Sequence, residues 1–146
     1  MSEIQQFLNS LIKDPAEREK FEFYYVEGHT SFHGRTTISI KFTEYLRKDL
    51  PPGNLPETID ENKKTEIKKF QLSAEAVNNF IRGLINEKIW ELKNCKEFGV
   101  PDETQANFYI KKGDHNVWEA TIWHNCIYQD KRAKAIYKLM TEIVLK

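Results

Sequence analysis

The sequence has little of several features that would identify a class of protein. It holds two cysteines, Cys95 and Cys126, which are too few for a disulfide framework. No apolar run approaches the roughly 18 residues that a membrane-spanning helix needs, and the first residues lack the basic-then-apolar pattern of a secretion signal. We therefore expect a cytoplasmic protein that does not contact membranes.

An excess of charge of one sign is also missing. Lys and Arg together number 22, and Asp and Glu together number 22, so the formal net charge is zero. No overall field draws the chain toward an anionic polymer, and we do not expect nucleic acid as a partner. A length of 146 residues with 40% hydrophobic residues predicts one domain, residues 1–146, with a sizeable core.

Local catalytic motifs are absent. The sequence contains no Gly-x-Ser-x-Gly, no His-Glu-x-x-His, no phosphate-binding loop and no dinucleotide-binding fingerprint. An active site assembled from distant positions leaves no such trace, so the absence does not exclude an enzyme. The balance favours a non-catalytic protein without a cofactor.

The clearest feature that is present is an alternation of apolar and polar residues around a turn. It occurs in residues 21–42 and again in residues 106–125, and both stretches are typical of β-hairpins. In the first hairpin, each of the two strands has one apolar face. The two apolar faces lie on the same side of the sheet only if the numbers of paired residues sum to an odd number. A sum of 63 places Phe23 opposite Ile40. In the second hairpin, a three-residue turn at 113–115 places Phe108 opposite Ala120.

Helical periodicity marks residues 2–13, 73–88 and 131–146, and a weaker strand pattern covers residues 66–72. Between the first hairpin and that strand, residues 48–64 hold three prolines and form a long loop. The predicted fold is α+β, in the order α-β-β-β-α-β-β-α. Its sheet is five-stranded and mostly antiparallel, made of two hairpins plus one strand, and its helices pack predominantly on one face.

Four residues form a possible pocket. His29 and His33 are four residues apart, but at a hairpin tip this spacing does not bring two imidazoles to one metal ion, so we expect no metal site. Together with Arg35, and with His124 at the end of the last strand, they could line a pocket beside the loop 48–64. This pocket supports an alternative function, a small enzyme or a ligand-binding protein.

The sheet face away from the helices is the stronger candidate site. Parity places Tyr24, Tyr109 and Trp123 on this face, with small hydroxyl residues between them. Aromatic side chains among small polar ones are typical of protein contact surfaces, although Tyr and Thr also favour ordinary exposed strands. We therefore predict a non-catalytic interaction module that binds a protein partner or itself, as a possible homodimer, through this face.

Overall fold

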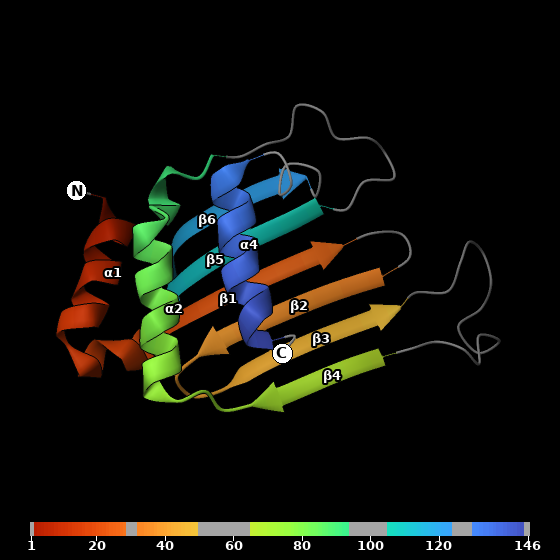
Figure 1. Ribbon diagram of the computed structural model, residues 1–146, viewed down its shortest axis with the longest axis horizontal. Helices are drawn as coiled ribbons and strands as arrows, with labels where there is room; N and C mark the ends of the chain where they lie inside the picture. Colours follow the sequence, from red (N-terminus) through yellow and green to blue (C-terminus); the bar gives the residue numbers. More distant parts are fainter. Residues whose placement is uncertain (1, 29–31, 50–64, 94–104, 124–129, 145–146) are drawn as a thin grey trace.

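The computed structural model describes residues 2–28, 32–49, 65–93, 105–123 and 130–144, with the backbone alone at Phe32, Asp49, Thr65 and Trp123. Within these ranges the chain forms one sheet with helices packed on one of its faces (Figure 1). The predicted α+β class is confirmed, and so is the antiparallel sheet. The predicted number of five strands is wrong, because the sheet has six.

The six strands follow the order β4-β3-β2-β1-β5-β6, and every neighbouring pair is antiparallel. Their bounds are β1 Phe21–Gly28, β2 Phe32–Ser39, β3 Thr43–Asp49, β4 Thr65–Phe70, β5 Gln105–Lys112 and β6 His115–Trp123. The two predicted hairpins therefore meet in the middle of the sheet, where β1 pairs with both β2 and β5.

The first hairpin keeps the predicted faces but not the predicted pairing. Phe23 lies opposite Ile38 instead of Ile40, a slip of two residues. Such a slip leaves every side chain on its original face, so burial of the apolar residues does not distinguish the two registers. A turn ends β2 before Ile40: the Ser39 hydroxyl donates to the Phe42 carbonyl at 2.9 Å and accepts from the Phe42 amide at 3.1 Å. As a result, Phe42 lies outside the strand and is 38% exposed.

This turn leads directly into β3, the strand that the sequence did not predict. Its residues, Thr43–Asp49, pair with β2 on one side and β4 on the other. The predicted order α-β-β-β-α-β-β-α is therefore wrong, because four strands precede the second long helix. Polar residues occupy most positions on both faces of β3, so the apolar alternation that marks the other strands is missing.

The second hairpin has the predicted pairing of Phe108 with Ala120. Its turn contains two residues, not three, because Lys112 pairs with His115. A bulge restores the register further along the hairpin, between Ile110 and Lys111. Gly113 begins the turn at φ +63°, a conformation that glycine adopts without steric cost.

Three long helices lie on one side of the sheet: α1 Glu3–Lys13, α2 Ala74–Asn86 and α4 Lys131–Val144. Helices α2 and α4 cross in front of the strands, and α1 lies beside α2 beyond the strand ends (Figure 1). Two short 3-10 helices, η1 Pro15–Lys20 and η3 Ile89–Glu91, follow α1 and α2. The three predicted helices and their position on one side of the sheet are confirmed. Helix α2 ends at Asn86, two residues before the predicted end, and residues 145–146 of the third predicted span lie outside the described residues. Among the described residues, no helix is long and apolar enough to cross a bilayer.

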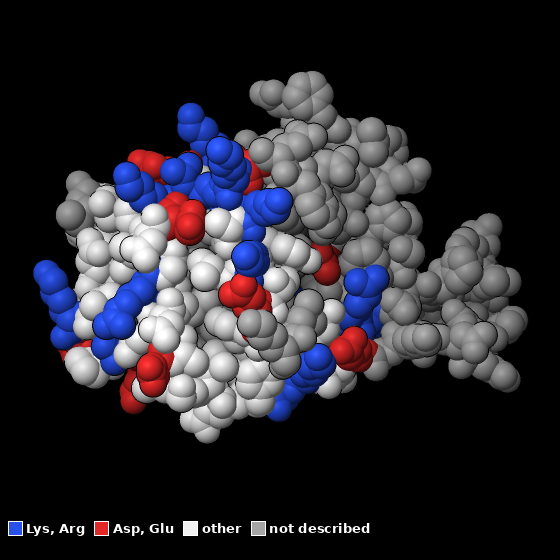
Figure 2. All heavy atoms as spheres, in the orientation of Figure 1, with Lys and Arg blue, Asp and Glu red and all other residues white. Residues whose placement is uncertain are grey.

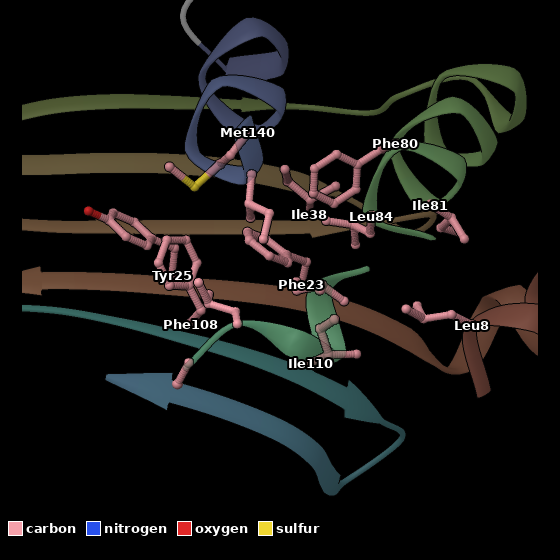
Figure 3. Packing of buried hydrophobic residues seen from close by; sticks show 14 of the residues in the cluster. Leu8, Phe23, Tyr25, Ile38, Phe80, Ile81, Leu84, Phe108, Ile110 and Met140 are labelled. Carbon is pink, nitrogen blue, oxygen red and sulfur yellow. The ribbon is translucent and has the colours of Figure 1, made fainter. Parts of the chain in front are cut away.

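The core lies between these helices and the sheet (Figure 3). Phe23 is fully buried, and its ring contacts that of Phe80 from α2 edge-on, with centroids 5.1 Å apart. It also packs against Phe108 of β5 at 6.1 Å. The apolar stripes of α1, α2 and α4 are therefore used on the same side of the sheet, and the opposite face has no helix over it among the described residues.

Candidate functional site

The face of the sheet away from the helices, called the open face below, is defined by strand register. Residues paired across the sheet share a face, so each row of partners assigns one position per strand. The row that crosses the middle of the sheet is called the central row. It runs in strand order through Lys69, Glu44, Thr37, Tyr24, Tyr109 and Glu119.

The structure brings Tyr24 and Tyr109 together at the middle of the open face. The two residues pair directly across β1 and β5, and their ring centroids lie 6.0 Å apart. The Lys111 ammonium lies 5.6 Å from the centroid of the Tyr24 ring, a cation–π distance. A shallow hollow of about 270 Å³ lies beside the two rings, with Val26 and Asn107 in its wall.

Trp123 ends β6, where its backbone pairs with Gln105. Its side chain lies outside the described part of the structure, so its contact with the tyrosines stays a prediction.

Apolar side chains continue from the tyrosines toward β4. Val26 and Leu46 lie half-buried, one on each side of Arg35. Ile67, the partner of Leu46 on the edge strand, is 59% exposed, the most exposed large hydrophobic residue in the described ranges. Ile67 and Leu46 form a small apolar patch at the β4 edge that a partner can cover, and Arg35 separates it from Val26 and the tyrosines.

Ion pairs neutralise part of the charge on the open face. The Arg35 guanidinium donates to the Glu44 carboxylate at 2.9 Å. This hydrogen bond raises the pKa of Arg35, with partial burial opposing it. The other charged side chains on this face include Glu22, Glu119, Lys69 and Lys111, so both signs are present across its width.

The four residues of the alternative pocket are only partly covered by the structure. His29 and His124 lie outside the described residues. His33 is exposed and, like Arg35, occupies an open-face position of β2, where Arg35 is engaged by Glu44. Across the described ranges, His, Cys, Asp and Glu side chains nowhere gather in groups of three that could hold a metal ion.

A second site, which the sequence analysis missed, lies on the helix-covered face between α4 and strands β1–β3. This end hollow has a volume of about 100 Å³, and its walls include Glu27, Tyr45, Arg47, Tyr137 and Met140. Glu27 is 8% exposed and accepts a hydrogen bond at 2.8 Å from the Tyr25 hydroxyl. Burial of a carboxylate is costly unless it is hydrogen-bonded or paired, so this hollow differs from the apolar cluster around Phe23.

Glycine makes room for this carboxylate. Gly34 lies directly opposite Glu27 in β2, and a Cβ at position 34 would lie 2.6 Å from Glu27 Oε1. The next residue in the same row is Arg47 of β3. The signal in the sequence was Glu27 itself, a charged residue that follows Phe21, Phe23 and Tyr25 at alternate positions on the core face of β1.

The helix-covered surface also carries charges of both signs. Figure 2 shows Lys and Arg side chains interspersed with Asp and Glu side chains over α2 and α4. Arg132 is held there by the Glu87 carbonyl at 2.7 Å and the Glu91 carboxylate at 3.0 Å. Such a charged surface is typical of solvated helices.

Comparisons with known proteins do not indicate which of these two sites is functional. No protein-family model matches the chain, and no curated protein matches it in sequence.

Proposed function

We propose that this chain is a non-catalytic interaction module that binds protein through its open face. The observation that carries the proposal is the placement of all three long helices on one face of a six-stranded sheet (Figure 1). The other face then presents the Tyr24–Tyr109 pair, the hollow beside it and the exposed Ile67. Tyrosine provides a large contact area at low cost in side-chain entropy.

The charges on this face favour protein over nucleic acid as the ligand. A surface that stacks single-stranded bases needs a basic groove beside its aromatic rings. Here Glu22, Glu44 and Glu119 lie in the same rows as the tyrosines or next to them, and Glu44 pairs with Arg35. Mixed charges around an aromatic centre match the rim and core of a protein interface.

Site-specific photo-crosslinking in living cells tests the proposal. A benzoylphenylalanine that replaces Tyr109 should give one discrete, light-dependent adduct. The same residue in place of Lys138, which is exposed on α4, should give none above background. Glu in place of Tyr24 should abolish the adduct at position 109, because it puts a charge beside the contact. Equal labelling at positions 109 and 138 would contradict the proposal.

The end hollow supports a second candidate function, the binding of a small polar molecule. The specific observation is the buried Glu27 carboxylate, which faces a hollow walled by the Tyr45 and Tyr137 side chains. Native mass spectrometry of the purified chain tests it. A retained small mass that disappears in a folded Glu27→Gln variant would support this function, and a bare polypeptide mass in both proteins would contradict it.

A further inference from the structure

We infer that the partner of the open face is a second copy of this chain, packed face to face about a two-fold axis. The axis runs parallel to the strands and passes between β1 and β2, the two middle strands of the sheet. This inference rests on the proposed function, and it adds the identity and the orientation of the partner.

The central row shows why a second copy fits. It begins at Lys69 on one edge strand and ends at Glu119 on the other. The proposed axis places β4 of one copy over β6 of the other, so Lys69 meets Glu119 at both edges of the interface. Both side chains are exposed in the single chain. Because the contact is isologous, each dimer contains this pair twice.

The middle of the row is compatible with the same arrangement. Tyr24 of one copy lies over Thr37 of the other, so a ring packs on a small side chain. Tyr109 lies over Glu44, whose carboxylate can accept a hydrogen bond from the phenol. An aromatic centre with a charged rim is the usual layout of a protein interface.

The charges also favour this axis over the alternative two-fold axis, which runs across the strands. A two-fold axis along the central row would place Lys69 over its own copy and Glu119 over its own copy. Like charges placed opposite one another disfavour a contact. The strand-parallel axis replaces both repulsive contacts with attractive ones.

The face is large enough for a specific contact. Six strands at a spacing of about 4.8 Å, with a rise of about 3.3 Å per residue, give each copy a face of roughly 650 Å². Two such faces cover about 1,300 Å², within the range of about 1,200–2,000 Å² for stable protein interfaces. Packed sheets rotate by about 30° against each other, and the long Lys69 and Glu119 side chains accommodate the offset at the edges.

Variants that exchange the charges at positions 69 and 119 test the inference. Sedimentation velocity measures the dissociation constant of the dimer for each variant. Lys69→Glu and Glu119→Lys should each weaken the dimer by about ten- to a hundredfold, because each creates two like-charge contacts. The double variant should restore the wild-type constant. An equal mixture of the two single variants should also dimerise, since their heterodimer contains only attractive pairs.

Lys138→Glu, on the helix-covered face, is the matched control and should leave the dissociation constant unchanged. The recovered affinity of the double variant cannot come from a contact within one chain, because Lys69 and Glu119 lie on opposite edges of the sheet. Circular dichroism checks that each variant is folded.

A wild-type protein that stays monomeric at every concentration would overturn the inference, and so would a double variant as weak as the single variants. In either case, a light-dependent adduct at position 109 with the mass of another protein would leave the proposed function standing. The absence of any specific adduct at position 109 would contradict both the proposed function and the inference.

Discussion

Phe23 and Tyr24 are neighbours in β1, yet the sheet places them in opposite environments. Phe23 is fully buried between Phe80 and Phe108, whereas Tyr24 is half-buried on the open face. Alternation along a strand makes this difference a direct test of the face assignment.

Phe23→Ala should lower the free energy of unfolding by about 3–5 kcal/mol, because it leaves a cavity in a packed core. Tyr24→Ala should cost less than half of that in the single chain. Urea unfolding followed by circular dichroism measures both, at a concentration low enough to exclude association. The reverse order would mean that the faces are inverted.

Gly34 and Glu27 form a second pair whose effects are coupled. Gly34→Ala should destabilise the fold by about 1–3 kcal/mol, since its Cβ would overlap the Glu27 side chain. In a Glu27→Ala background the same substitution should cost much less, because the side chain that it meets is gone. A double-mutant cycle of unfolding free energies measures the coupling. Strictly additive effects would show that the close approach does not exist.

Tyr45 provides a pH-dependent test of the end hollow. Burial raises the pKa of its phenol above the ordinary 10.0, and the Glu66 carboxylate also raises it, while Arg47 opposes the shift. The folded state therefore holds this proton more tightly. Its contribution to stability is complete below about pH 10 and is lost as the pH rises through the folded-state pKa. Above pH 10, the unfolding free energy of Tyr45→Phe should therefore fall less than that of the wild type. Parallel plots of unfolding free energy against pH would contradict the raised pKa of Tyr45.

Helix α2 begins at a serine that the sequence already identifies. The Ser73 hydroxyl accepts a hydrogen bond from the Ala76 amide at 3.1 Å, and the helix then buries Val77, Phe80, Ile81 and Leu84. Ser73→Ala should cost about 1 kcal/mol of unfolding free energy, because one amide loses its cap. Ser73→Asp should retain most of the stability. An alanine variant as stable as wild type would show that the cap contributes nothing.

Elements with one apolar face were predictable from the sequence, and elements without one were not. The helices and both hairpins follow from periodicity. The pairing of Phe108 with Ala120 was predicted from a three-residue turn, and it holds because a bulge compensates for the shorter turn of the structure. Strand β3 was missed because Glu44, Arg47 and Lys48 interrupt its pattern. Its position depends on β2 and β4, which pair with it on both sides.

The two sites differ in the same way. The positions of Tyr24 and Tyr109 on the open face were predictable, because parity alone assigns them. The end hollow was not, since it combines Glu27 with residues of β3 and α4 that are distant in the sequence. The register slip of two residues in the first hairpin was not predictable from parity, which both registers satisfy, and the Ser39 turn that ends β2 was not recognised in the sequence.

The whole chain has no net charge and uses all three long helices on one side of its sheet. A balanced charge does not oppose the approach of a second copy, and the open face then decides where contact occurs. We therefore propose that the face with Tyr24 and Tyr109 is the surface where protein binds.

Sedimentation velocity of the wild type and of Tyr109→Glu tests this proposal, with Lys138→Glu as the control. We predict that the wild type and the control reach twice the 17.3 kDa chain mass as concentration rises. Tyr109→Glu should stay at the mass of a single chain, with an unchanged circular dichroism spectrum. If Tyr109→Glu reaches twice the chain mass as the wild type does, the open face is not the surface that joins the two copies and the account is wrong.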